Sequence, residues 1–233
     1  MTAPLNLLCA GAAQGLVKAL QAQLTAQTGA TLASSFGAVG AMKEALLAGA
    51  PCDLMIVTDA MVAALCDSGQ LLTASRAALG RVRTGLALRA GDAAPDVASP
   101  EALRVALLAA PAIYFPDPAR ATAGIHFADV MRQLGIFEAV TSRLRTFPNG
   151  ATAMRALAAC AEPGAIGCTQ ITEILYTSGI ALLGALPPQF ELATVYTAAV
   201  SATAAQPALA AQFIEMLAGA GSRDLRQAGG FEF

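Results

Sequence analysis

Short apolar runs alternate with longer stretches of helical periodicity in the first part of the chain. Strands are expected at Leu5–Cys9, Thr31–Ser35 and Leu54–Val57, where the apolar runs are short. Each is followed by a helical pattern, and these helices are expected at Gly15–Thr28, Ala38–Ala48 and Asp59–Ser68, the last with Asp59 as its N-cap. This alternation predicts a parallel sheet with helices on both faces.

A second series of elements begins near Arg83. Its expected elements are, in order, strand Thr84–Arg89, a helix opened by Ser99-Pro100-Glu101, strand Ile113–Phe115, helix Gly124–Leu134, strand Leu144–Phe147, helix Gly150–Cys160, strand Ile166–Thr169 and a short helix from Thr172. After Pro187-Pro188, a strand at Thr194–Val200 returns to the first series, and a last helix follows Pro207. The order predicts an α/β protein with two lobes, residues 1–82 plus 195–233 and residues 83–194. A two-strand hinge and a cleft between the lobes are expected.

The composition excludes several classes of protein. Of 233 residues, 56% are hydrophobic and 13% charged, which excludes a disordered chain. The mean hydropathy of +0.58 suggests a membrane protein, but the longest bulky charge-free run, Val105–Phe115, is broken by Pro111. A spanning helix needs about 20 apolar residues, so no membrane insertion is expected. The net charge of −2 and pI of 5.4 give no basic surface for nucleic acid.

The sequence offers no metal or cofactor motif. The five cysteines are odd in number and lack a Cys-x-x-Cys spacing, and His126 is the only histidine. Neither a dinucleotide-binding Gly-x-Gly-x-x-Gly nor a P-loop occurs. We therefore expect no cofactor and no metal. No basic residue precedes Lys18, so the chain as it stands is expected to be cytoplasmic, or periplasmic if a leader has been removed.

Small residues gather where strands pass into helices. The three junctions are Ala10–Gly15, Ser34–Gly40 and Arg120–Gly124. Ligands of open α/β sheets bind beyond the carboxyl ends of strands, where helix N-termini favour anions. The candidate ligand-binding residues there are Gly11, Ala12, Gly37, Ala38, Val39, Thr122 and Ala123. The simpler alternative is that Gly and Ala only permit tight turns.

Four further polar residues have two interpretations each. Arg120, just before a helix, is either a carboxylate-binding side chain or a solvent-exposed loop residue. Gln170 lies at a strand end together with Thr169 and Thr172, and all three are good neutral hydrogen-bond donors. The alternative for Thr172 is that it only caps the helix that follows. His126 and Glu173 are candidate bases. Otherwise His126 is a structural histidine, and Glu173 a first-turn charge opposite the helix dipole.

Several segments resemble the molybdate-binding type of bacterial solute-binding proteins over nearly the whole chain. They are Ser34-Ser35-Phe36, Ala48-Gly49-Ala50-Pro51-Cys52-Asp53-Leu54, Pro116-Asp117-Pro118 with Ala123-Gly124-Ile125, Gly184-Ala185-Leu186-Pro187-Pro188 and Gly230-Phe231-Glu232. The resemblance implies a type II periplasmic-binding-protein-like fold. It also implies an anion site in which Ala12 and Val39 replace the family's two serines and Gln170 replaces its tyrosine. Ala123 matches the family's alanine, and Thr152 stands where the family has valine.

The two missing hydroxyls change the expected ligand. Each would leave a buried oxyanion underbonded by about 1–3 kcal/mol. A small organic carboxylate, with Arg120 as its counter-charge, is therefore expected rather than molybdate, bound by a solute-binding protein of ABC-transporter type. The expected partners are that ligand and, if the protein is exported, an ABC permease.

The alternative is a cofactor-independent isomerase, because aconitate isomerase resembles the same group. It would shift a double bond by proton transfer with His126 or Glu173 as base. A third possibility is a protein that has a purely structural role and binds no small molecule. It is the least favoured, because it would leave the small-residue junctions without a function.

Overall fold

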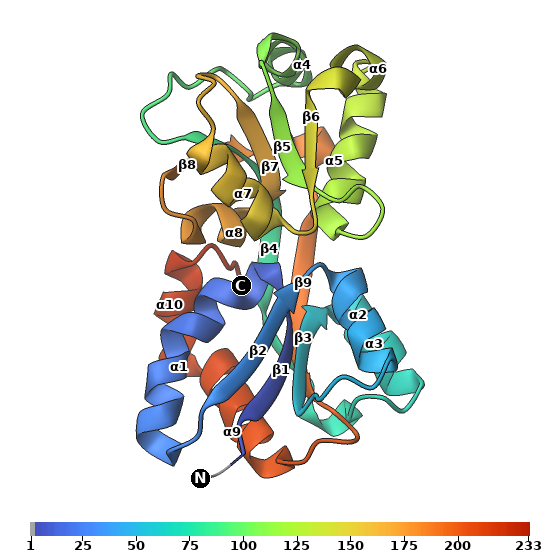
Figure 1. Ribbon diagram of the computed structural model, residues 1–233, viewed down its shortest axis with the longest axis vertical. Helices are drawn as coiled ribbons and strands as arrows, with labels where there is room; N and C mark the ends of the chain where they lie inside the picture. Colours follow the sequence, from blue (N-terminus) through green and yellow to red (C-terminus); the bar gives the residue numbers. More distant parts are fainter. Residues whose placement is uncertain (1–2) are drawn as a thin grey trace. The chain divides into compact units, whose positions relative to one another are not determined.

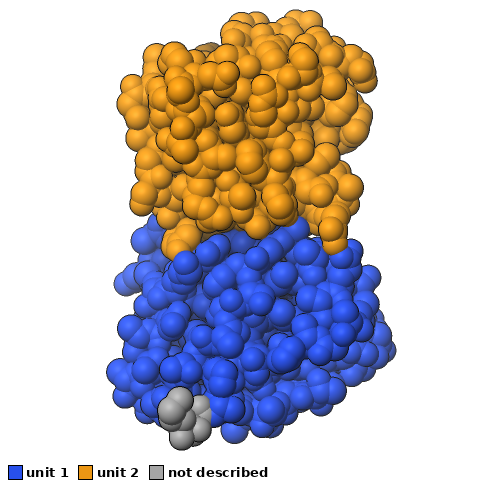
Figure 2. Space-filling model, in the orientation of Figure 1, with its two compact units in different colours: residues 1–82, 194–233 blue, residues 83–193 orange. Residues whose placement is uncertain are grey.

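The computed structural model describes residues 3–233, which form two compact units (Figure 2). Unit 1 contains the residues up to Val82 together with Thr194–Phe233, and unit 2 contains Arg83–Ala193. The chain therefore passes from one unit to the other twice, once along strand β4 (Ala77–Arg89) and once at the start of strand β9 (Ala193–Val200).

Unit 1 is built on the strand order β2-β1-β3-β9 (Figure 1). Strands β1 (Leu5–Ala10), β2 (Leu32–Gly37) and β3 (Leu54–Thr58) run parallel, as the alternating pattern predicts. Strand β9 pairs antiparallel with β3. The carboxyl ends of the three parallel strands therefore meet at one edge of the sheet.

Among the described residues, unit 1 has five helices, and all but the last of them bury an apolar face against this sheet. They are α1 (Gln14–Thr28), α2 (Val39–Leu47), α3 (Asp59–Asp67), α9 (Pro207–Ala218) and α10 (Arg223–Ala228), with short 3-10 turns at Gly11–Ala13, Thr73–Ser75 and Ala220–Ser222. The expected N-cap of α3 is wrong by one residue, because Thr58 is the N-cap and Asp59 the first helical residue. The Asp59 carboxylate accepts hydrogen bonds from Arg76 and Thr197 instead.

A buried carboxylate joins separate parts of unit 1 at the opposite edge of its sheet. Asp53, 1% exposed, accepts hydrogen bonds from the Asn6 backbone N–H at 2.7 Å and from Asn6 Nδ2 at 3.0 Å. Its other oxygen accepts from the Gln206 backbone N–H at 2.9 Å, at the N-cap of α9. Asp53 thus fixes the starts of β1, β3 and α9 together.

Unit 2 has the strand order β4-β7-β5-β6, with β8 on the other side of β4. Its strands after β4 are β5 (Ile113–Pro116), β6 (Leu144–Phe147), β7 (Ile166–Gln170) and β8 (Ile180–Ala185). Strand β5 runs parallel to β6 and β7, whereas β4 pairs antiparallel with β7 and β8. The sequence pattern did not predict β8.

The helices of unit 2 are α4 (Pro100–Ala109), α5 (Thr122–Gln133), α6 (Phe137–Val140), α7 (Gly150–Ala159) and α8 (Ile171–Tyr176), with 3-10 turns at Thr141–Arg143 and Pro188–Phe190. Helix α5 begins at Thr122, two residues before the expected start, because Ala121 rather than a residue near Gly124 has the extended N-cap conformation. The predicted Ser99 cap of α4 is confirmed by its hydrogen bond from Ala102 N, at 3.1 Å.

The two faces of β7 contact different helices. Ile166 and Cys168 belong to the apolar cluster that contains Phe127 and Met131 of α5. Gly167 faces α7, because a Cβ atom there would lie 2.7 Å from both Leu157 and Met154. Side chains alternate along a strand, so Gln170 lies on the α5 face and Thr169 on the α7 face.

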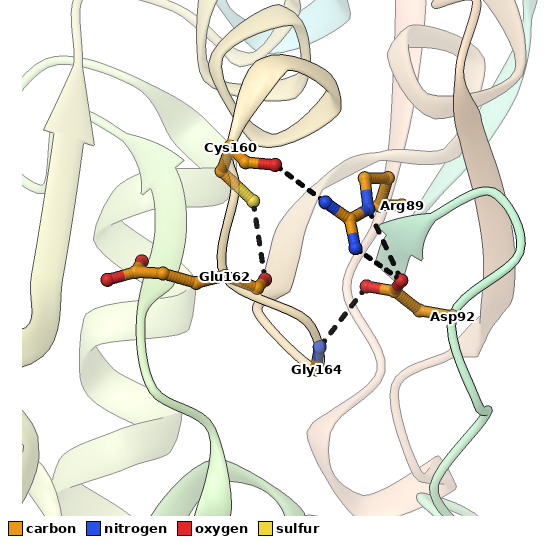
Figure 3. Close-up of polar contacts among 5 residues, drawn as sticks. All are labelled: Arg89, Asp92, Cys160, Glu162 and Gly164. Carbon is orange, nitrogen blue, oxygen red and sulfur yellow. Dashed lines mark hydrogen bonds and ion pairs between the residues drawn. The ribbon is translucent and has the colours of Figure 1, made fainter.

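At the C-terminal end of β4, a polar network ties the loop that follows β4 to the segment between α7 and β7 (Figure 3). Arg89 donates to the Cys160 carbonyl at 2.7 Å and to the Asp92 carboxylate at 2.8 Å. Asp92 also accepts from the Gly164 N–H at 3.2 Å. The network holds the C-terminal end of α7 and the loop that enters β7.

Three of the cysteines are small core residues. Cys9, Cys52 and Cys168 are buried, and burial raises the pKa of each thiol above its usual range, to about 12 for Cys52. Their thiols are therefore protonated at neutral pH. Within residues 3–233, no helix has the length and apolar content that crossing a membrane requires.

Candidate functional site

The two small-residue junctions of unit 1 are neighbours at the carboxyl edge of its sheet. Ala10 and Gly37, the last residues of β1 and β2, are register partners in the parallel pair. Gly11 and Ala12 follow in a 3-10 turn, and Ala38 and Val39 open helix α2. All of these residues are buried. The structure thus brings the five candidate residues of unit 1 together.

The helical segments at these junctions begin without a side-chain cap. Ala10 and Ala38 occupy the N-cap positions. In the structure as described, neither residue provides a side-chain acceptor for the N–H groups of the first turn. Helix α4 and helix α7 differ, since Ser99 and Asn149 cap them. The N–H groups of the uncapped first turns, with the positive end of the helix dipole, are suited to an anion.

In unit 2 the third junction has the same character. Ala121 is the N-cap of α5 and, among the residues described, provides no side-chain cap. Thr122 and Ala123 form the first turn, and a Cβ atom at Gly124 would overlap the carbonyls of Pro116 and Asp117. The first turn of α5 therefore packs directly on the end of β5, and only glycine fits there.

Arg120 lies in the turn between β5 and α5, and the residue is exposed. It precedes Thr122, the first residue of α5, by two positions. Both interpretations of Arg120 are compatible with exposure, because a ligand-binding arginine in an open site is exposed as well.

Thr152 belongs to the cap of α7. Its backbone N–H and its hydroxyl both donate to Asn149 Oδ1, each at 2.9 Å. Arg155 donates to the same hydroxyl at 3.0 Å. The first turn of α7 thus differs from the turns at the small-residue junctions, because the Thr152 N–H already donates to the Asn149 side chain.

Gln170 ends strand β7 and is also the N-cap of α8. Its side chain is 3% exposed, and neither Oε1 nor Nε2 has a hydrogen-bond partner in the described residues. The hydroxyls of Thr84 and Thr172, both buried, have none there either. Thr84 was not among the ligand-binding residues expected from the sequence. There it is only a threonine at the start of an apolar run, which gives little indication of a binding role.

Glu173 lies on the other side of β7 from Gln170. Its carboxylate accepts hydrogen bonds from the Thr169 hydroxyl and from the Ala151 backbone N–H, the latter at 3.2 Å. Burial raises the pKa of this carboxyl, and the hydrogen bonds offset part of that rise. Glu173 therefore satisfies the start of α7 from inside unit 2.

His126 lies in the second turn of α5 and is half-buried. Its Nε2 is 2.7 Å from the Phe190 carbonyl oxygen. A carbonyl only accepts, so Nε2 carries a proton and donates it to this bond. The interaction holds the 3-10 turn at Pro188–Phe190 against α5. It agrees with the interpretation of His126 as a structural histidine.

Comparison with known proteins gives one family and related folds. A family model described as bacterial extracellular solute-binding protein matches residues 5–232. Aconitate isomerase from Pseudomonas sp. is 25% identical over 220 residues, which cover 92% of this chain and 82% of that protein.

Two solved structures share the fold. The periplasmic molybdate-binding protein of Azotobacter vinelandii has a TM-score of 0.79 at 22% identity, covering 98% of this chain and 99% of that one. The sulfate-binding protein SubI of Mycobacterium tuberculosis has a TM-score of 0.76 at 17% identity, covering 99% and 86%. The α/β fold of this chain is that of type II periplasmic binding proteins, as the sequence predicts.

Proposed function

We propose that this chain, which belongs to the bacterial extracellular solute-binding protein family, binds a small organic carboxylate as the solute-binding component of an ABC transporter. The proposed ligand contacts are the helix N-termini at its small-residue junctions. In unit 1 these are Gly11, Ala12, Gly37, Ala38 and Val39. In unit 2 they are Thr122 and Ala123, with Arg120 as counter-charge and with Gln170 and Thr152 beside them.

The observation that carries this proposal is the coincidence of small residues, a strand end and an uncapped helical start at Ala10, Ala38 and Ala121. Other helices, such as α3 and α9, also begin without a side-chain cap bond in the described residues, but not at a small-residue junction. Helices usually receive Ser, Thr, Asp or Asn at the N-cap, and this chain places Ser99 and Asn149 at two of its other helices. Within residues 3–233, the three junction helices have alanine instead. Their first-turn N–H groups are then available to an anionic ligand, without any lysine.

The residue types at the junctions favour a carboxylate over a compact tetrahedral oxyanion. Ala12 and Val39 offer no hydroxyl, and so these positions provide only backbone donors. A planar guanidinium such as that of Arg120 pairs with a carboxylate through two parallel hydrogen bonds. The molybdate and sulfate named for the solved relatives therefore serve as comparison ligands in the test.

The proposed partner is an ABC permease, which the liganded protein would meet if it is exported. This would place the protein in the periplasm, the location named for the Azotobacter relative. Fractionation of cells that express the gene from its own start tests the location.

The test is isothermal titration of the purified protein with succinate, citrate, aconitate, molybdate and sulfate. We expect at least one carboxylate to bind more tightly than either inorganic anion. Arg120→Ala is expected to weaken that binding at least about tenfold, the loss of one charge-assisted pair. Arg104→Ala, which removes an exposed arginine on α4, is the matched control and should bind as the parent does. Tighter binding of molybdate or sulfate contradicts the proposed ligand class.

The second candidate is an isomerase, favoured by the 25% identity to aconitate isomerase. Two residues were candidate bases, and both have structural partners: Glu173 bonds to Thr169 and Ala151, and His126 to the Phe190 carbonyl. This favours binding over proton transfer. Proton NMR of aconitate incubated with the protein in D2O decides, because a double-bond shift by proton transfer produces new isomer signals with deuterium incorporation.

A further inference from the structure

We propose that Thr84 and Gln170 form a neutral donor–acceptor pair that binds a hydroxyl group, so that the ligand is a hydroxy-substituted carboxylate. This inference rests on the proposed function, because it takes the site to bind an organic anion. It adds the chemical class of the anion and one ligand-binding residue, Thr84.

The two side chains are neighbours across a strand pair. Thr84 of β4 and Gln170 of β7 are direct register partners in the antiparallel ladder. Directly opposite side chains of such a pair lie on the same face of the sheet. The backbone of Thr84 is fully bonded, since its N–H donates to the Leu192 carbonyl at 2.9 Å and its carbonyl accepts from the Leu186 N–H at 3.3 Å. Of the polar groups of Thr84, the hydroxyl therefore is the one without a partner in the described residues.

Three buried polar atoms meet here without a partner. Thr84 is 1% exposed and Gln170 3% exposed. Thr84 Oγ1, Gln170 Oε1 and Gln170 Nε2 make no hydrogen bond within residues 3–233, not even with one another. Native proteins pair nearly all buried polar atoms, because an unpaired one has lost its hydration without compensation. Three such atoms on one strand pair indicate that a polar group from outside the chain binds them.

The location connects this pair with the start of α5. Gln170 is on the face of β7 that carries Ile166 and Cys168, and those two residues pack against α5. The ends of β5 and β7 and the start of α5 belong to the same edge of unit 2. In the proposed site one small molecule bridges the two, with its carboxylate at the uncapped N–H groups of α5 and a second group at the Thr84–Gln170 pair.

The donor and acceptor pattern identifies that second group. A glutamine amide presents one acceptor and two donor hydrogens, and a threonine hydroxyl donates and accepts. A fully deprotonated oxyanion only accepts, so it would leave Gln170 Oε1 unpaired and repel it. A hydroxyl group both donates and accepts, and it can bond to Gln170 Oε1, Gln170 Nε2 and Thr84 Oγ1 in one arrangement. This excludes a simple dicarboxylate as the best ligand.

The experiment compares anions that differ by one hydroxyl, malate with succinate and citrate with tricarballylate, by isothermal titration. The hydroxylated member is expected to bind at least about tenfold more tightly, since a site built to hydrogen-bond a hydroxyl rejects the analogue without it. Thr84→Val keeps the shape of the side chain and should bring the ratio close to one, because it weakens the binding of malate and citrate more than that of succinate and tricarballylate. Gln170→Leu should also bring the ratio close to one, with some loss of affinity for all four anions. Thr146→Val, at an exposed position of β6, is the control and should keep the parent ratio.

The outcomes separate this inference from the proposed function. Equal affinity for both members of each pair, or a ratio that Thr84→Val and Gln170→Leu leave unchanged, overturns the inference and assigns the three atoms to a buried water. The binding of organic anions would still stand in that case. If molybdate or sulfate binds and none of the four carboxylates does, the proposed ligand class fails and this inference fails with it. A melting curve for each variant confirms that it is folded.

Discussion

The Thr169 hydroxyl donates a hydrogen bond to the Glu173 carboxylate, and both residues are buried on the α7 side of β7. The same carboxylate accepts from the Ala151 N–H in the first turn of α7. Strand, helix α8 and helix α7 are thus joined through one acidic side chain, and this arrangement leaves no space for a side chain at Gly150.

Gly150→Ala is expected to destabilise the protein. Its Cβ atom would overlap both Thr169 Oγ1 and Glu173 Oε2, so the carboxylate or the helix must move. Overpacking of this kind costs about 1–3 kcal/mol, and loss of the Glu173 hydrogen bonds adds to it. Urea unfolding measures the change. Gly184→Ala is the control, because its Cβ atom has no neighbour within 4 Å among the described residues, and equal losses in the two variants would contradict the packing at Gly150.

The raised pKa of Glu173 predicts a pH dependence of stability. The folded protein holds this proton more tightly than the unfolded chain, whose carboxyl titrates near its ordinary value of 4.5. The contribution of Glu173 to stability is therefore full below pH 4.5 and is lost as the pH rises through the folded pKa. Glu173→Gln removes this dependence.

The check is the free energy of unfolding of parent and Glu173→Gln in urea at several pH values above 4.5. The parent should lose stability relative to the variant as the pH rises. Glu101→Gln, at an exposed first-turn position of α4, should follow the parent. Parallel profiles for the parent and Glu173→Gln would show that burial does not shift this carboxyl.

Asp53→Ala is expected to cost at least about 3 kcal/mol of stability. Asp53 accepts three hydrogen bonds from Asn6 and Gln206, and its removal leaves two partly buried backbone N–H groups unpaired. Hydrogen bonds to a charged group contribute about 1.5–3 kcal/mol each. Chemical denaturation measures the loss. Asp67→Ala, at the exposed C-terminal end of α3, should change stability by less than about 0.5 kcal/mol, and a similar loss there would refute the role of Asp53.

A cap introduced at α2 is expected to compete with the ligand. In Ala38→Asp the new carboxylate accepts from the first turn of α2 and repels an anion, so carboxylate affinity should fall at least about tenfold while the helix is better capped. Ala38→Ser, with a smaller and neutral cap, should weaken binding less. Ala208→Asp puts the same charge in the first turn of α9, at the opposite edge of the unit 1 sheet, and should bind normally. Unchanged affinity in Ala38→Asp would remove α2 from the site.

Local signals accounted for much of the fold. Ser99-Pro100-Glu101 predicted the start of α4, and the alternation of runs predicted the parallel strands β1, β2 and β3. Strand β8 was missed because its residues are half-exposed and show no regular alternation of buried and exposed positions.

The site was less predictable because it depends on pairings between distant residues. Nothing near Thr84 in the sequence indicates that it lies opposite Gln170. Likewise, the sequence placed Glu173 in the first turn of its own helix, where the structure has it, but gave no sign that the carboxylate also accepts from the first turn of α7. The small-residue junctions were visible in the sequence, but the missing caps that make them suitable for an anion became visible only with the hydrogen bonds of each helix.

The most direct test of the central claim, that helix N-termini at the small-residue junctions bind an organic anion, is amide NMR of the labelled protein titrated with the tightest-binding carboxylate. We expect the largest shifts at the N–H groups of Gly11–Ala13 and Val39 in unit 1 and of Ala123 and Gly124 in unit 2. Unit 1 also has a surface pocket of about 430 Å³ at the opposite edge of its sheet, lined by Asn6, Gly49 and Gln70 among others. Largest shifts at those three residues, with the junction amides unmoved, would contradict the account.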